Sequence, residues 1–211
     1  MKHLFLFIIF LCSSALHAQE FKLQAGDLIF QEDCGDNTDN TIKAVTNSID
    51  NYRFTHIGIV YIDVDDRIYV LEATHPRVAK TSLQDYLYPK NKTCVPKSVV
   101  GRLKQTFQPL IPDALKFGLK LIGKEYDDGF VLGNDKYYCS EFVYEILYKA
   151  NENQAVFPLN IMTFKSPTTG DITDGWKEYF RKYDLPIPEG ELGINPGAMS
   201  QSEVIDIVHY Y

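Results

Sequence analysis

The chain has 211 residues, of which 45% are hydrophobic and 13% aromatic, which is enough to bury one substantial core. The formal net charge is −7 and no basic stripe is visible, so binding to nucleic acid or to an anionic membrane surface has little electrostatic support. No internal repeat, low-complexity tract or long linker divides the chain. A single domain over residues 19–211 is therefore predicted, behind a targeting segment.

The first 18 residues combine a basic start, a short apolar run and small residues, which is typical of a secretory signal peptide. The apolar run, residues 4–11, is too short to remain as a transmembrane anchor. An exported protein, periplasmic or extracellular, is expected. Lipidation at Cys12 is a weaker alternative, because two bulky residues precede this cysteine where small ones are preferred.

Three cysteines remain after removal of the signal segment: Cys34, Cys94 and Cys139. An odd number in an oxidising compartment leaves one thiol unpaired or pairs it between chains. Cys34 and Cys94 can form a disulfide, but the sequence does not establish this pairing. The absence of a CxxC pair disfavours a structural zinc site.

The first half of the mature chain carries the patterns of short strands. Residues 55–62 are rich in β-branched side chains, and a short acidic turn at 63–66 leads into a second such run at 67–73. This arrangement predicts an antiparallel hairpin. Further strands are predicted at 26–31 and 98–103.

Apolar residues at helical spacing predict several helices. Asp39 can cap the first, which carries Ile42, Val45 and Ile49 on one face. The remaining predicted elements are a helix capped by Asp113 and ending near Gly123, a helix starting at about Cys139, a short helix over 176–183, and a strand over 203–209 that returns to the sheet. Antiparallel strands with separate helices favour the α+β class.

Cys139 falls at the predicted first turn of a helix. Unpaired backbone N–H groups and the positive end of the helix dipole favour a thiolate there, and the same groups can stabilise an oxyanion. This position is typical of a nucleophile in acyl transfer. A small buried core residue is the alternative interpretation, because free cysteines are commonly buried.

The mature chain offers three histidines as a general base: His56, His75 and His209. His56 lies at the entrance to a strand, where an imidazole can reach a neighbouring helix N-terminus. Counting inward from the acidic turn places Ile62 opposite about Arg67. His56 then lies opposite about residue 73, next to Glu72. A slip of one residue in this register would change which face each side chain occupies.

Other polar residues carry weaker predictions. A zinc site of Glu72, His75 and His56 is disfavoured, because side chains three residues apart on an extended chain point to opposite faces. We expect no metal and no organic cofactor. Among the tyrosines, Tyr126 and Tyr138 are predicted to line the substrate site or to donate a hydrogen bond to an oxyanion.

Six sequence blocks between residues 26 and 150 occur in an order that is more specific than any one block. They are GDLIF at 26–30, THIGIV at 55–60, LEA at 71–73, VGRL at 100–103, GKEYD at 123–127 and YCSEFV at 138–143. With them the chain resembles the permuted papain-like amidases of the YiiX/YaeF type, within the wider NlpC/P60 superfamily. No motif of this kind is recognised after residue 150.

The resemblance implies a circularly permuted papain-like fold, in which a small antiparallel sheet packs against helices and Cys139 starts a helix over the sheet. It also implies that Cys139 is the nucleophile, His56 the base and Glu72 the group that orients the imidazole. In this family the histidine and the acid precede the cysteine along the chain, and the spatial arrangement rather than the order defines such a site.

These residues predict an exported cysteine hydrolase that cleaves an amide or peptide bond, with a small peptide or amide as substrate. A peptidoglycan fragment is one candidate, because export would place the enzyme beside the cell wall. A lipid acyltransferase or lipid hydrolase of the lecithin retinol acyltransferase type is an alternative that predicts an apolar cleft. A peptide-binding module without activity is a third, disfavoured by the intact Cys139, His56 and Glu72.

Overall fold

The computed structural model describes residues 21–33, 37–90 and 94–211, with the side chains of Asn37 and Asp39 excepted. The predicted signal segment lies outside these residues. The question of whether Cys34 pairs with Cys94 also lies outside them, although Cys94 itself is disulfide-bonded. Within the described part of the chain, no helix combines the length and the apolar character needed to span a membrane.

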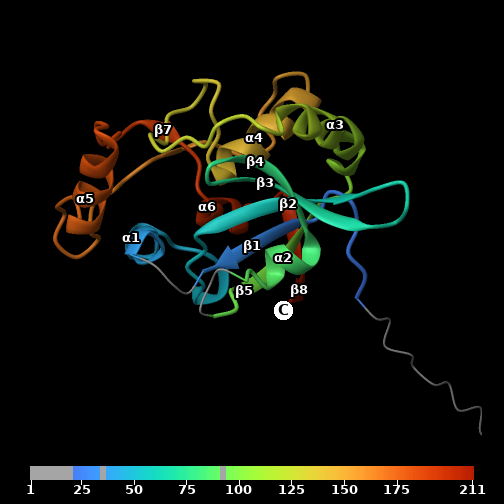
Figure 1. Cartoon of the computed structure of the whole chain (residues 1–211), viewed down its shortest axis with the longest axis horizontal. Coiled ribbons are helices and arrows are strands. Elements are labelled where there is room, and N and C mark those ends of the chain that lie inside the picture. The colour runs from blue at the N-terminus through green and yellow to red at the C-terminus, as the bar shows by residue number, and fades with distance from the viewer. Residues whose placement is uncertain (1–20, 34–36, 91–93) are drawn as a thin grey trace, which may run out of the picture.

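A six-stranded antiparallel sheet forms the centre of the molecule, with strand order β4-β3-β2-β1-β5-β8 (Figure 1). The strands are β1 (Leu28–Glu32), β2 (His56–Ile62), β3 (Ile68–Thr74), β4 (Arg77–Ser82), β5 (Lys97–Leu103) and β8 (Ile205–Tyr210). A small second sheet pairs β6 (Asn160–Ile161) with β7 (Leu192–Gly193). The predicted α+β class is confirmed, and so is the return of the C-terminal segment to the sheet.

The helices surround this sheet and also form one end of the molecule, where α1 and α5 lie side by side (Figure 1). They are α1 (Asn37–Val45), η1 (Ile49–Asn51), α2 (Leu83–Leu87), η2 (Gln108–Leu110), α3 (Ile111–Leu121), α4 (Cys139–Ala150), α5 (Asp174–Tyr183) and α6 (Pro196–Ser200). The predicted start of a helix at Cys139 and the predicted helix near Trp176 are both confirmed.

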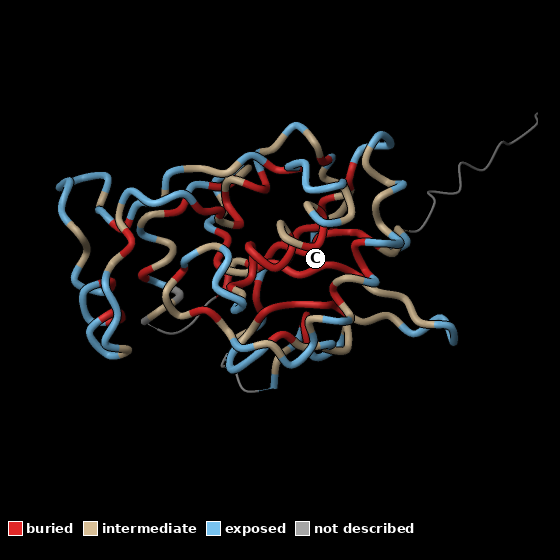
Figure 2. Tube along the Cα trace, turned by 90° about the horizontal axis from the view of Figure 1, so that it is seen from above, coloured by how far each residue is buried: buried red, intermediate tan, exposed pale blue. Residues whose placement is uncertain are grey.

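Both faces of the central sheet are buried, and alternate residues of each strand divide between them. Along β1, Leu28 and Phe30 belong to the cluster that includes α3 and α4, whereas Ile29 belongs to the cluster that includes α2. Figure 2 shows the buried trace concentrated in the middle of the molecule. Because side chains alternate along a strand, this two-sided burial fixes how each strand is paired with its neighbours.

Three details of the predicted elements are wrong. Ile62 pairs with Ile68 rather than with Arg67, so the β2–β3 register is shifted by one residue. Ile49 lies in η1 and not in the first helix. Asp113 lies within the first turn of α3 rather than at its cap. Whether Asp39 caps a helix concerns a side chain that is not described.

Two elements of the hairpin region were missed by the sequence patterns. The strand β4 pairs with β3 along its whole length, and α2 follows it directly. Its sequence, RVAKTS, is polar because β4 is an edge strand of the sheet. Charged side chains at an edge prevent pairing with another chain, and they also conceal the strand from a search for apolar alternation.

A buried ion pair connects the start of β1 to β5. Asp27 is 1% exposed and accepts hydrogen bonds from Arg102 at 2.7 Å (Nε) and 2.8 Å (Nη2). One carboxylate oxygen also accepts from the backbone N–H of Gln24 at 2.8 Å. The sequence blocks GDLIF and VGRL therefore meet in space through a bidentate contact between the guanidinium of Arg102 and the carboxylate of Asp27.

Replacing Arg102 by Met should lower the free energy of unfolding by about 3 kcal/mol, because the carboxylate of Asp27 would stay buried without its counter-ion. Urea unfolding followed by circular dichroism measures this change. Arg181→Met is the matched control, since the Arg181–Glu178 pair is exposed on both sides and its loss should leave the midpoint unchanged. Equal unfolding midpoints for the two variants would contradict the structural role given to Asp27.

Candidate active site

The imidazole of His56 and the carboxylate of Glu72 form a direct contact. His56 begins β2 and Glu72 lies in β3, and the observed register places both side chains on the same face of the sheet. His56 Nε2 lies 2.5 Å from Glu72 Oε2, and the other carboxylate oxygen accepts a hydrogen bond from the hydroxyl of Thr81. Glu72 is 6% exposed. The carboxylate is therefore held from both sides and fixes the orientation of the ring.

Cys139 is the first residue of α4, and its sulfur approaches the beginning of β2. The sulfur lies 4.0 Å from the carbonyl oxygen of Thr55, the residue that precedes His56. This thiol is also one of the two groups that raise the pKa of the His56 ring. The three predicted side chains thus lie at one site, where the carboxylate contacts the imidazole directly and the sulfur lies beside the residue that precedes it.

The surroundings of His56 favour its charged form. Burial lowers the pKa of the imidazole, but hydrogen bonds to Cys139 and Glu72 and the negative charges of these two groups raise it. The outcome is a pKa raised from 6.5 to about 10. An imidazolium at neutral pH is the form that can stabilise a thiolate and donate a proton to a leaving group.

Glu141 organises the start of the helix that carries Cys139. Its carboxylate accepts hydrogen bonds from the backbone N–H of Gly133 at 3.1 Å and of Tyr138 at 3.4 Å. Burial is the main cause that raises the pKa of Glu141 to about 8. The sequence analysis assigned this residue no role. The available signal was an acid at the third helical position, which is typical of a capping box.

The two predicted tyrosines lie at the site in different ways. Tyr138 is 2% exposed, and its hydroxyl accepts a hydrogen bond from the backbone N–H of Ile194 at 3.2 Å. Tyr138 therefore lines the site, and its hydroxyl oxygen already has a hydrogen-bond partner. Tyr126 is half-buried, and its ring lies 4.1 Å from that of His75. Its hydroxyl makes no hydrogen bond to another described residue.

The sulfur and the imidazole face two different cavities. His56 and Glu72 line a cleft of about 530 Å³ whose walls also include Asp33, Asp85 and Lys182. Cys139 lines a pocket of about 90 Å³ whose walls are largely apolar. The two cavities meet at residues that line both of them: Ile42, Thr55, Tyr126 and Phe130.

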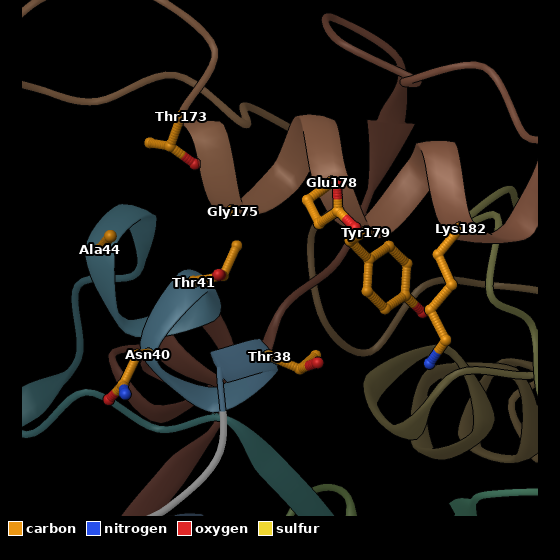
Figure 3. Close-up of a pocket in the computed structure, with 9 residues that line it drawn as sticks. All are labelled: Thr38, Asn40, Thr41, Ala44, Thr173, Gly175, Glu178, Tyr179 and Lys182. Carbon is orange, nitrogen blue, oxygen red and sulfur yellow. The ribbon is translucent and has the colours of Figure 1, made fainter.

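A groove between α1 and α5 adjoins the polar cleft and has a volume of about 540 Å³. Thr38, Tyr179 and Lys182 line both the groove and the cleft. Figure 3 shows the side chains of Tyr179 and Lys182 next to each other, extending from α5 into this space. The polar side of the site is therefore open to a substrate larger than a single amino acid.

A thiol at a helix N-terminus, paired with an imidazole and a carboxylate on an antiparallel sheet, is typical of papain-like enzymes, here in permuted chain order. The chain belongs to the family described as permuted papain-like amidase enzyme, YaeF/YiiX, C92 family, whose model matches residues 22–209. The predicted family and fold are thereby confirmed. A comparison with curated proteins gives no match.

The crystal structure of the metalloprotein yiiX from Escherichia coli O157:H7 has a similar fold. The TM-score is 0.72 at 22% sequence identity, and the alignment covers 90% of this chain and 99% of that chain. In the described residues of the present chain, no group of three or more His, Cys, Asp and Glu side chains is placed to hold a metal ion. His75 instead contacts Asp128, with 3.4 Å between Nε2 and Oδ1.

Replacing Glu72 by Gln should move the titration of His56 from about pH 10 toward its ordinary value of 6.5, because the negative charge behind the ring is lost. NMR titration of histidine-labelled protein measures the midpoint, and the signals of His75 and His209 serve as internal references. Since a raised pKa means that the imidazolium persists below about pH 10, activity should fall as the pH rises through this value. The activity of the Glu72→Gln variant should fall at a lower pH than the activity of the unchanged protein.

The control for this titration is Glu203→Gln, which removes an exposed carboxylate in the turn before β8. Its His56 midpoint should equal that of the unchanged protein. A His56 midpoint near 6.5 in the unchanged protein would show that the ring is not held between two negative groups.

Proposed function

We propose that this protein is an exported cysteine hydrolase that cleaves an amide or peptide bond through Cys139, His56 and Glu72. The observation that supports it best is the convergence on the His56 imidazole of the Glu72 carboxylate, which contacts it, and of the Cys139 thiol at the start of α4, which raises its pKa. Membership of an amidase family supports the same reaction class. Each of the three residues has a separate role in this reaction.

In the proposed first step, the thiolate of Cys139 attacks the carbonyl carbon of the scissile amide. The tetrahedral intermediate collapses as the carbon–nitrogen bond breaks, and the imidazolium of His56 gives its proton to the leaving amine. A thioester remains on the sulfur. Water then attacks the thioester, His56 takes one proton from this water, and the acid leaves as the thiolate is restored. Glu72 keeps the ring in place throughout.

Backbone N–H groups at the start of α4 would hold the oxyanion. The first N–H groups of a helix have no partner within it, and they lie at the positive end of its dipole. The N–H of Tyr138 is occupied by Glu141. The N–H of Cys139 makes no hydrogen bond to another described residue, which leaves it free to donate to a developing negative charge beside the sulfur.

For the substrate we propose a small peptide or amide, and for the location the periplasm or the extracellular space. The location rests on the predicted signal peptide. The proposal of a peptidoglycan-derived peptide as substrate rests on this location and not on the geometry of the site. The groove between α1 and α5 supports a peptide, because it extends the polar cleft beyond His56.

One observation favours the lipid alternative. The pocket beside Cys139 is lined by apolar side chains, including Val45, Phe130 and Phe164. An acyl chain would be compatible with such walls.

Cys139→Ala should reduce amide hydrolysis at least about a thousandfold, because no other group can form the thioester. It should leave the thermal unfolding midpoint nearly unchanged, since the residue is small and lies at the end of a helix. Activity is measured with a library of dipeptide anilides, and folding by circular dichroism. Full activity of Cys139→Ala on a substrate of the unchanged protein would refute the assignment of the nucleophile.

A further inference from the structure

The short helix α6 lies next to α4, and the segment before α6 is hydrogen-bonded to the start of α4 (Figure 1). The backbone N–H of Ile194 donates to the hydroxyl of Tyr138 at 3.2 Å. The carbonyl of Ile194 accepts a hydrogen bond from the hydroxyl of Ser140 at 2.9 Å. Because Tyr138 and Ser140 are the chain neighbours of Cys139, the residue after Ile194 is held close to the nucleophile. This residue is Asn195, which lines the same pocket of about 90 Å³ as Cys139.

The side chain of Asn195 is oriented by a hydrogen bond to α6. Its oxygen accepts from the backbone N–H of Ala198 at 2.8 Å, which makes Asn195 the N-cap of this helix. Because a backbone N–H can only donate, this contact also decides which end of the amide carries the nitrogen. The nitrogen, Nδ2, is therefore turned away from Ala198.

The amide nitrogen of Asn195 is unpaired and accessible. It makes no hydrogen bond to another described residue. Within the described part of the chain, buried side-chain polar atoms without a partner belong only to Asn160 and Trp176, so the nitrogen of Asn195 is not enclosed. Of the three cavities, Asn195 lines the pocket of Cys139 and neither of the others. A group bound in this pocket can therefore accept a hydrogen bond from the amide.

Most other polar side chains of the pocket already donate to another part of the protein: Thr46, Thr55, Ser140, Asn160 and Thr163. Two tyrosine hydroxyls remain. The ring of Tyr126 lies against His75 on the side of the polar cleft. Tyr138 is 2% exposed, and its oxygen already accepts from Ile194. Asn195 is thus the side chain best placed to donate to a group beside the sulfur.

Acyl transfer creates a negative charge beside the sulfur of Cys139. When the thiolate attacks, the carbon–sulfur bond forms and an electron pair of the carbonyl bond moves to its oxygen. Donors that are fixed in place before the reaction stabilise this oxyanion most effectively. The backbone N–H of Cys139 is one such donor. An oxyanion has more than one lone pair, so it can accept a second hydrogen bond.

We infer that Asn195 is a further catalytic residue, whose side-chain amide donates the second hydrogen bond to the oxyanion. The inference rests on the proposed function and adds one residue to the same site. The bond to Ala198 holds the amide in place before a substrate binds. Because the oxyanion exists only during acyl transfer, Asn195 should affect the rate of acylation and not the reactivity of the thiolate itself.

Two reagents separate these effects, and neither requires knowledge of the natural substrate. p-Nitrophenyl acetate acylates the thiolate through a tetrahedral oxyanion and releases p-nitrophenolate. Iodoacetamide alkylates the same sulfur by displacing iodide, without an oxyanion. The acylation rate is measured from the burst of p-nitrophenolate, after subtraction of the rate that remains in Cys139→Ala. The alkylation rate is measured by mass spectrometry of the peptide that contains Cys139.

Asn195→Ser is the decisive variant, because serine can still cap α6 but has no amide nitrogen and a shorter side chain. Its acylation rate should fall about a hundredfold, whereas its alkylation rate and thermal unfolding midpoint should stay close to those of the unchanged protein. Asn134→Ser is the matched control and should keep both rates. Asn134 is exposed and outside the three cavities, and its oxygen likewise accepts from a backbone N–H, that of Lys136 at 3.0 Å.

An unchanged acylation rate in Asn195→Ser would overturn the inference, and so would equal losses of acylation and alkylation, which indicate a structural role. A larger loss of acylation in Tyr126→Phe than in Asn195→Ser would assign the donor to that hydroxyl and would also overturn it. If Asn195→Ser fails to fold, Asn195→Asp keeps the cap, and its ratio of acylation to alkylation gives the same comparison because a carboxylate cannot donate.

A different result would count against the proposed function. If the unchanged protein reacts with both reagents only at the rates of an ordinary thiol, Cys139 is not an activated nucleophile, and the inference fails with the function. Fast reaction of the unchanged protein combined with an unaltered Asn195→Ser would refute the role of Asn195 alone. The two failures are therefore distinguishable in one set of measurements.

Discussion

The antiparallel register between β2 and β3 is the constraint on which the site depends. Ile59 pairs with Leu71, and Val60 pairs with Val70, so residues of even number face residues of even number. His56 and Glu72 consequently share a face. A slip of one residue would place them on opposite faces and would also move Ile59 and Val60 out of their respective clusters. Core packing on both sides of the sheet thus secures the contact between imidazole and carboxylate.

Two opposing effects determine the pKa of His56. Removal from water disfavours the charged ring, whereas the thiol in front of it and the carboxylate behind it favour the charge. Hydrogen bonds to charged groups are stronger where water is excluded, so burial also strengthens the contacts that oppose its own effect. Thr81 contributes indirectly, because it occupies the second oxygen of Glu72 and leaves the first to the ring.

The sequence predicted the elements that carry the chemistry more reliably than the contacts between them. The β-branched run of β2 and the apolar spacing of α4 located His56 and Cys139 correctly. The register of the hairpin was wrong by one residue, because counting from a turn cannot reveal which residues the turn itself includes. The residues that α5 contributes to the cavities, such as Trp176 and Lys182, were not predicted as site residues. Their helix was predicted, but it carries no recognised motif, and only the tertiary fold brings it to the site.

The predictable and the unpredictable site residues come from different parts of the chain. The segments up to α4 supply the thiol, the imidazole and the carboxylate, whereas α5 supplies walls to all three cavities. Trp176 lines the pocket, and Tyr179 and Lys182 line both the cleft and the groove. These residues are three positions apart, so they share one side of the helix. Exchanging side chains on this side would change the shape and charge of the cavities while leaving Cys139, His56 and Glu72 in place.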